Sequence, residues 1–174
     1  VECASARPAA EHAREEEEEP DHDEHPDEVG ERHPAGSGEV AMQRGSLGSD
    51  SVRAWAGHWM LRETLTKKYA VKTFGEFNYA SGDASATDGV RRTFDQLYPT
   101  PHDKIGLADQ VGWRNIRHAR AGLELTPRKG VVVSTSYHAF WLSNTKDALY
   151  NAGGTIVARV AGGAASAHVG QEMD

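Results

Sequence analysis

The chain has 174 residues, a net charge of −7 and 38% hydrophobic residues. Its single cysteine, Cys3, excludes an internal disulfide framework and a cysteine-based zinc site. No stretch approaches the roughly 18 consecutive apolar residues of a transmembrane helix. Low mean hydropathy does not exclude a membrane β-barrel, because half of each such strand faces water.

The charge is unevenly distributed. Residues 1–37 carry 13 acidic and 3 basic side chains, so residues 38–174 carry 13 acidic and 16 basic ones and are mildly basic. Residues 1–37 contain almost no large apolar side chain, and like charges repel, so we predict a disordered segment. His22 and His25 lie among acidic neighbours that could hold a divalent metal weakly, but a solvated acidic run is the preferred interpretation. No signal peptide opens the chain, so it was removed or the chain begins within a longer protein.

Alternating apolar and polar residues begin at residue 39. Residues 39–45 predict a short strand, followed by a Gly-rich link at 46–50, and residues 51–65 and 69–80 predict two long strands joined by a polar turn at 66–68. One face of the two long strands collects Trp55, Trp59, Leu61, Val71, Thr73, Phe77 and Tyr79. The other face collects His58, Arg62, Lys72, Glu76 and Asn78.

The register of these two strands can also be predicted. If Leu65 pairs with Tyr69, Trp59 lies over Gly75 and Phe77 lies over Gly57, and aromatic rings that cover strand glycines stabilise sheets. The same register places Arg62 opposite Lys72, which is unfavourable unless water or an anion lies between them.

Residues 81–110 predict a long connection rich in Gly, Asp, Pro and Thr, and connections of this length in compact domains are usually functional. Within it, residues 83–89 place oxygen-bearing side chains at alternate positions, as in a calcium loop, but lack the bidentate Glu at the twelfth position. An ordinary polar loop is the preferred interpretation, and loop calcium is the secondary one. We otherwise predict no cofactor and no metal site.

Residues 112–126 and 131–142 predict a β-hairpin with a three-residue turn, 128–130, in which Gly130 adopts the left-handed conformation. This turn pairs Pro127 with Val131, Arg120 with His138 and Glu124 with Ser134, and places Ala121 opposite Tyr137 and Leu125 opposite Val133. One register therefore sorts both strands into the same two faces. The polar face carries Arg114, His118, Arg120, Glu124, Ser134, Ser136 and His138. The apolar face carries Ala119, Ala121, Leu123, Leu125, Val133, Thr135, Tyr137, Ala139 and Trp141.

A second long loop, 143–165, contains a small apolar stretch at 155–160. Residues 168–174 then open a further strand, with Val169, Gln171 and Met173 on one face and His168, Gly170, Glu172 and Asp174 on the other. The predicted strands are therefore longer than is usual in soluble proteins, and the connections between them are alternately short and long. That layout is typical of an outer-membrane barrel with short periplasmic turns and long extracellular loops.

Several segments together resemble the C-terminal part of bacterial alginate-export-type outer-membrane proteins. They are RAWAGHW, FGEFNYASGD, TFDQLYPTPHDKIGLADQVGWRNI, YHAFWL, DALYNA and HVGQEMD, within residues 38–174. The resemblance implies a single-chain barrel of roughly sixteen to eighteen strands, a polar lumen for an anionic polysaccharide or similar solutes, and periplasmic export partners. Residues 1–37 do not match the family pattern.

The predicted fold is therefore all-β, an antiparallel up-and-down transmembrane β-barrel of which residues 38–174 supply about five or six strands. Because so few strands cannot close a barrel and the sequence stops in mid-strand, we expect a fragment of a longer protein. We predict no enzyme activity and no nucleic-acid partner. The predicted solute pathway comprises Arg62, Lys72, Glu76, Arg114, His118, Arg120, Glu124 and His138, with His58 beside them. The predicted lipid-facing aromatics are Trp55, Trp59, Phe77, Tyr79, Tyr137 and Trp141.

A basic lumen would attract anionic solutes, because low-dielectric walls focus its electrostatic field. If Arg120 instead pairs with Glu76 or Glu124, the pore is polar without being anion-selective. Two other functions remain open. In a soluble all-β carbohydrate-binding module, Trp55, Trp59, Tyr137 and Trp141 would stack on sugars. A hydrolase would need a Ser–His–acid set, but no carboxylate in the sequence pattern orients His138 beside Ser134 and Ser136.

Overall fold

The computed structural model describes residues 34–98 and 105–174, which belong to a compact unit spanning Arg32–Asp174. Most of the predicted disordered segment, with His22 and His25, lies outside the described residues. Within those residues no helix is long and apolar enough to cross a membrane. The described elements are β1 Ala35–Leu47, β2 Asp50–Thr66, η1 Lys68–Ala70 (a 3-10 turn), β3 Val71–Ala80, β4 Val90–Arg91, β5 Ile116–Arg128, β6 Val131–Leu142, β7 Leu149–Tyr150, β8 Ile156–Ala158 and β9 His168–Met173.

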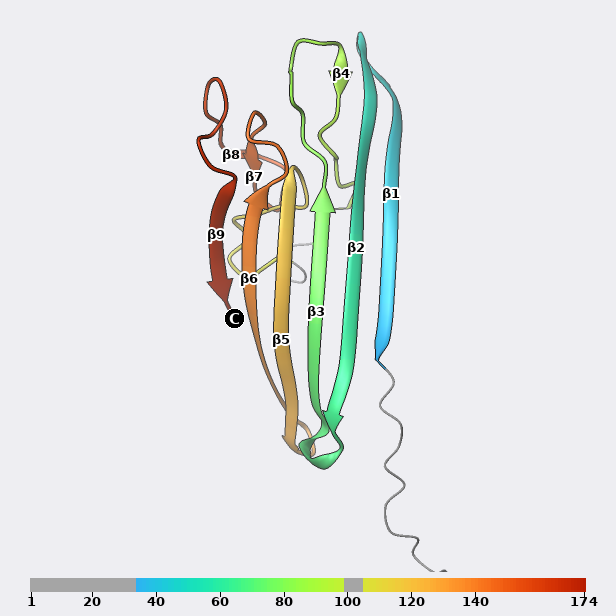
Figure 1. Ribbon diagram of the computed structural model, residues 1–174, viewed down its shortest axis with the longest axis vertical. Coiled ribbons are helices and arrows are strands. Elements are labelled where there is room, and N and C mark those ends of the chain that lie inside the picture. Colours follow the sequence, from blue (N-terminus) through green and yellow to red (C-terminus); the bar gives the residue numbers. More distant parts are fainter. Residues whose placement is uncertain (1–33, 99–104) are drawn as a thin grey trace, which may run out of the picture. The chain divides into compact units, whose positions relative to one another are not determined.

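The long strands form one antiparallel sheet in the order β1-β2-β3-β5-β6-β9, so the all-β, up-and-down prediction is confirmed (Figure 1). The short β4 adds in parallel to the start of β2, and β7 pairs with β8 in a separate hairpin. Residues 67–70 and 129–130 connect strands at one end of the sheet, called the turn end here. Residues 81–115 and 143–167 connect strands at the opposite end, called the loop end.

Loop length is not fully segregated between the two ends. The β1–β2 connection is a two-residue turn, Gly48–Ser49, at the loop end, where Gly48 has φ +63°. The Gly-rich link predicted at residues 46–50 is therefore a tight turn between strands that are both longer than predicted. Pairing of Leu47 with Asp50 closes this hairpin.

The predicted β5–β6 register is confirmed at four pairs: Arg120 with His138, Glu124 with Ser134, Ala121 with Tyr137 and Leu125 with Val133. Only the turn differs. A register shift after Leu125 pairs Arg128, not Pro127, with Val131, and leaves a two-residue turn in which Gly130 has φ +80°. Proline has no N–H to donate to a ladder, so a bulge around Pro127 is a natural place for the shift.

The predicted β2–β3 register is wrong by two residues. Trp59 pairs with Phe77, and Arg62 pairs with Phe74 rather than with Lys72. The reason is a longer turn: Tyr69 and Ala70 adopt φ +62° and +44° and extend the connection beyond the predicted 66–68. A shift by an even number keeps every side chain on its predicted face.

The two faces of the sheet have opposite polarity. The inner face, defined by Glu76, Asn78, His118, Ser136 and His138, is polar, yet each of these residues is buried. The outer face is apolar and exposed. It includes Val40 (54% exposed), Trp55, Trp59, Leu61, Phe77, Leu123, Val133 and Tyr137. A protein folded in water shows the reverse arrangement.

Aromatic rings cover strand glycines, although not the predicted pairs. Trp59 lies so close over Gly57 of its own strand that a Cβ at Gly57 would overlap the ring. Phe74 lies across Gly122 in the same way. Gly75, predicted to lie under Trp59, faces open space on the outer side.

At the loop end a small apolar core covers the inner face. Ala54, Ala56 and Ala80 present short side chains there, and Phe94 and Val111 from the loop 81–115 pack against them. Gln43 of β1 holds this loop, since its Nε2 donates to the Asp95 carbonyl and its Oε1 accepts from the Asp95 N–H at 2.9 Å. Phe94, Asp95 and Val111 of this loop therefore lie against the inner-face side of the sheet.

The last strand departs from its predicted alternation at its start. A bulge between Phe140 and Trp141 places His168 opposite Trp141 on the outer face, with the two rings 6.4 Å apart. Val169 packs instead against the loop-end core. From Gly170 onward the predicted faces hold, with Glu172 opposite His138 and Met173 opposite Tyr137.

Candidate functional site

The inner face carries a continuous row of polar side chains across the sheet. His58 Nδ1 lies 2.7 Å from Asn78 Oδ1, and Asn78 Nδ2 lies 3.0 Å from His118 Nδ1. His118 Nε2 lies 3.0 Å from His138 Nδ1. Four strands, β2, β3, β5 and β6, each supply one of these residues. Strand alternation explains the row, because every second side chain of each strand points to the same face.

Glu76 and Arg120 run beside this row. Glu76 Oε1 accepts from Asn78 Nδ2 at 2.7 Å, and its Oε2 lies 3.5 Å from Arg120 Nη1. Arg120 Nη2 also donates to Ser136 Oγ at 3.2 Å, and its guanidinium carbon lies 4.9 Å from the centre of the Phe74 ring. Arg120 is therefore held by a carboxylate, a hydroxyl and an aromatic ring.

Lys72 and Glu124 form a second ion pair nearer the turn end, with Nζ and Oε1 2.9 Å apart. Arg62, on β2, is exposed and forms no ion pair among the residues that the structure describes. Two of the predicted pathway cations thus form ion pairs with carboxylates, whereas Arg62 interacts with the Glu124 carboxylate only at longer range.

Arg114 does not belong to this face. Its prediction assumed a strand from residue 112, but β5 begins at Ile116, after Asn115 with φ +49°. Arg114 lies in the loop, with Nη1 3.3 Å from both Asp95 Oδ1 and the Gly154 carbonyl. Its guanidinium carbon also lies 4.8 Å from the centre of the Tyr150 ring, so it connects the two long loops.

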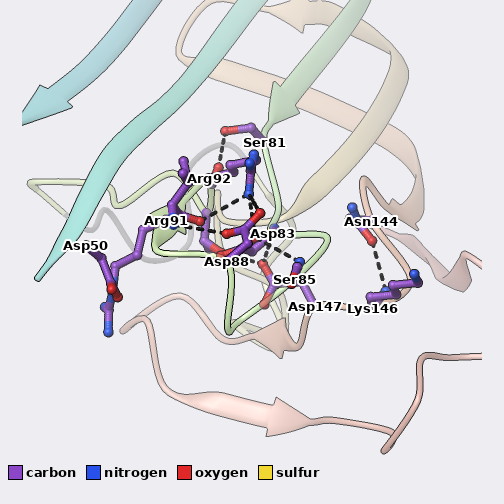
Figure 2. Close-up of polar contacts among 12 residues, drawn as sticks. Asp50, Ser81, Asp83, Ser85, Asp88, Arg91, Arg92, Asn144, Lys146 and Asp147 are labelled. Atoms are coloured by element: carbon purple, nitrogen blue, oxygen red, sulfur yellow. Dashed lines mark hydrogen bonds and ion pairs between the residues drawn. The ribbon is translucent and has the colours of Figure 1, made fainter.

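Acidic residues of the segment 83–89, for which an ordinary polar loop is the preferred interpretation and loop calcium the secondary one, contact an arginine (Figure 2). Arg92 Nη1 lies 2.8 Å from Asp88 Oδ2 and 3.4 Å from Asp83 Oδ1. Hydrogen bonds from the Val90 N–H and from Arg92 lower the pKa of Asp88 below its usual value. In the described part of the chain, no group of three or more His, Cys, Asp or Glu side chains is arranged to hold a metal.

Asp147 joins the two long loops and was not identified from the sequence. Its Oδ2 accepts from the Asp83 N–H at 2.8 Å and from the Thr93 hydroxyl, and its Oδ1 accepts from the Tyr150 hydroxyl at 2.9 Å. Burial, followed by the nearby Asp147 carboxylate, raises the pKa of Tyr150. The fully buried Asn115 reinforces the second loop, since its Nδ2 donates to the Asn144 and Ala148 carbonyls.

A carboxylate does approach His138, contrary to the prediction. His138 Nε2 lies 3.0 Å from Asp174 Oδ2 and 3.1 Å from Ser136 Oγ. In a catalytic triad the serine and the acid contact opposite nitrogens of the ring. Here both contact Nε2, and Nδ1 contacts His118, so these residues do not form the relay of a serine hydrolase.

All six predicted aromatics lie on the outer face. Trp55 stacks on Tyr79 with ring centres 4.3 Å apart, and Trp59 stacks on Phe77 at 6.1 Å. Tyr137 is 43% exposed, and Trp141 is half-buried beside His168. Their common direction follows from the confirmed alternation of β2, β3 and β6.

Comparisons with known proteins complete the assignment. The family model described as alginate export matches residues 36–174, which includes every strand from Gly36 of β1 to β9. A search of curated proteins and a search of solved structures found no match. The matched family is a transport family rather than an enzyme family. The chain therefore belongs to the alginate export family of outer-membrane polysaccharide export channels.

Proposed function

We propose that the inner face is the wall of a hydrated pathway that conducts an anionic, alginate-like polysaccharide or small anionic solutes. The observation that carries this proposal is the reversed polarity of the sheet. An exposed face of Trp, Phe, Leu and Val beside a buried face of His, Glu, Asn and Ser is unfavourable in water. The same arrangement is favourable when lipid covers the first face and solute passes the second.

The dimensions of the apolar face agree with a bilayer. From Val131 to Trp141, β6 presents no charged side chain on the outer face. Ten residue steps at about 3.3 Å give about 33 Å along the strand, and a tilt of about 40° reduces this to the roughly 25 Å of an outer-membrane apolar band. Charged residues on this face, which include Arg44, Arg53, Glu63 and Arg117, lie toward strand ends.

Charge on the described inner face is largely balanced by the Arg120–Glu76 and Lys72–Glu124 pairs. These two cations then shape a polar wall and attract anions only weakly. Arg62 is exposed and unpaired among the described residues, so it is the inner-face cation that contributes most to anion preference.

We further propose that the loops 81–110 and 143–165 gate the pathway at the loop end. Phe94 and Val111 already lie on the inner face, and Asp147 ties the loops to each other. Opening would require Phe94 and Val111 of the loop 81–115 to separate from the alanines that they contact on the inner face. Periplasmic export partners would approach from the turn end, opposite these loops.

The test is conductance of the full-length protein in planar bilayers, with the anion/cation permeability ratio measured in a salt gradient. We expect open-channel currents that fall when polyuronate is added. Arg62→Gln should reduce anion preference more than the double variant Lys72→Gln with Glu124→Gln, because the double variant removes an ion pair and leaves the net charge unchanged. The double variant Arg120→Gln with Glu76→Gln should likewise change anion preference less than Arg62→Gln, because these two side chains also form an ion pair.

The competing function is a soluble carbohydrate-binding module with the outer aromatics as the sugar platform. It predicts that the protein stays soluble without detergent, forms no channel, and loses saccharide binding in Trp59→Ala. That set of results would replace the channel proposal. Equal permeability ratios in the wild type and Arg62→Gln would retain the channel and remove the assigned role of Arg62.

A further inference from the structure

Two arginines face each other directly on the outer side of the β1–β2 hairpin. Arg44 pairs with Arg53 in the register, and both side chains are exposed. Neither forms an ion pair or a hydrogen bond among the described residues, and no acidic side chain shares their row. Like charges directly opposite each other destabilise a strand pair. An anion between them would remove that cost.

The neighbouring rows on the same face change from apolar to polar in order. Met42 pairs with Trp55 on the side nearer the turn end. Ser46 pairs with Ser51 on the opposite side, nearer the Gly48–Ser49 turn at the loop end. The sequence of rows is therefore aromatic, cationic and then hydroxyl-bearing. This is the order in which a membrane surface presents acyl chains, phosphates and polar headgroups.

A hollow follows this strip. It has a volume of about 830 Å³, and its lining includes Val40, Met42 and Trp55 together with Arg44 and Arg53. The apolar lining suits an acyl chain, and two guanidinium groups suit a phosphate, which they can bind in a bidentate manner. A soluble polysaccharide would leave the apolar lining unused.

We propose that Arg44 and Arg53 bind the phosphate group of an anionic membrane lipid in the leaflet at the loop end, whose acyl chain lies along Val40, Met42 and Trp55. The proposal rests on the lipid-facing placement of the outer face given above. It assigns this site to lipid, separate from the solute pathway on the inner face. In an outer membrane with the long loops outside, the matching lipid class is a phosphorylated glycolipid.

The test measures binding of lipid A to the full-length protein in neutral nanodiscs by native mass spectrometry. Each basic residue near an anionic surface contributes about 1 kcal/mol. We therefore expect about fivefold weaker binding in Arg44→Gln or Arg53→Gln and about thirtyfold weaker binding in the double variant. The matched control is Arg128→Gln with Lys129→Gln, an exposed basic pair at the turn end, which should leave binding unchanged.

Four further measurements make the outcome decisive. Raising the salt concentration should weaken binding to the unmodified protein, which needs no variant to fold. Inorganic phosphate should compete poorly, because it cannot fill the apolar lining. Polyuronate should not compete, and single-channel conductance should be unchanged in the double variant.

Wild-type binding by the double variant, or salt-independent binding by the unmodified protein, would overturn the proposal. Equal competition by inorganic phosphate would make this a free-anion site, and competition by polyuronate would make it a cargo site. Failure of the channel proposal would appear separately, as absent conductance with lipid binding intact.

Discussion

A lysine introduced at Ala121 tests the placement of the sheet most directly. Ala121 is exposed on the outer face and pairs with Tyr137, near the middle of the uncharged stretch of β6 from Val131 to Trp141. In water, a substitution at an exposed strand position changes the free energy of unfolding by less than about 0.5 kcal/mol. At the midplane of a bilayer, a lysine on the lipid face of a barrel costs about 2–4 kcal/mol.

Two matched variants separate depth from face. Val131→Lys places the same charge on the outer face at the turn end, about five residue steps or 16 Å along the strand from the middle, and should cost about 0–1 kcal/mol. Ser134→Lys places it on the inner face opposite Glu124, where it is exposed to the proposed pathway and gains a carboxylate neighbour. Its cost should be within about 0.5 kcal/mol.

The assay is equilibrium unfolding by urea of the full-length protein in lipid vesicles, followed by tryptophan fluorescence. The expected order of destabilisation is Ala121→Lys, then Val131→Lys, then Ser134→Lys. If all three variants unfold within about 0.5 kcal/mol of the wild type, the outer face is in water and the assignment to lipid is wrong. If Ser134→Lys is the most destabilised, the two faces have been exchanged.

Three other predictions follow from individual contacts. Gly75→Ala should stabilise the protein by about 0.4–1 kcal/mol, because the added Cβ would face open space. Gly122→Ala should destabilise it by about 1–3 kcal/mol, because the added Cβ would overlap Phe74 and the Thr135 carbonyl. Urea midpoints of the two variants that move in the same direction would contradict this pair of predictions. Asp147→Ala should raise amide exchange at Asp83, whose N–H donates to Asp147, and lengthen channel openings, and unchanged exchange would exclude the loop connection. The folded-state pKa of Tyr150 is raised, so the contribution of Tyr150 to stability is complete below pH 10 and is lost as the pH rises through the raised pKa. Tyrosinate absorbance should therefore show ionisation of Tyr150 only above pH 10.

The sequence was informative wherever alternation and turn chemistry agreed. In the β5–β6 hairpin, Gly130 marks the one position that needs a left-handed backbone, and four predicted pairs are present. In the β2–β3 hairpin, Tyr69 and Ala70 occupy left-handed conformations that their residue types do not predict. The faces were still predicted correctly, because an even register shift preserves the alternation.

The structure of the loops could not be predicted from local sequence patterns, because it depends on contacts between residues far apart in the chain. Asp147 receives hydrogen bonds from Asp83 and Thr93, more than 50 residues earlier in the chain. Arg92 contacts the carboxylates of Asp83 and Asp88, an arrangement that the spacing of acidic residues alone does not reveal. Arg114 was predicted to lie on a strand because the alternation of apolar and polar residues extends to positions before Ile116, where β5 begins.

The alanines of the inner face show how a single pattern serves two purposes along the same strands. Toward the turn end, inner positions hold two ion pairs, Lys72 with Glu124 and Glu76 with Arg120. Near the loop end, the equivalent positions hold Ala54, Ala56 and Ala80, and their small volume leaves room for Phe94. Small residues at those positions would have little value in an open pore, whose wall needs only to be polar. Their burial with Phe94 and Val111 indicates instead that this end of the inner face holds these residues of the loop 81–115 against the sheet. Replacing Ala56 by Leu should therefore displace Phe94 and increase conductance, whereas an open-pore wall would show the reduced conductance of a narrower channel.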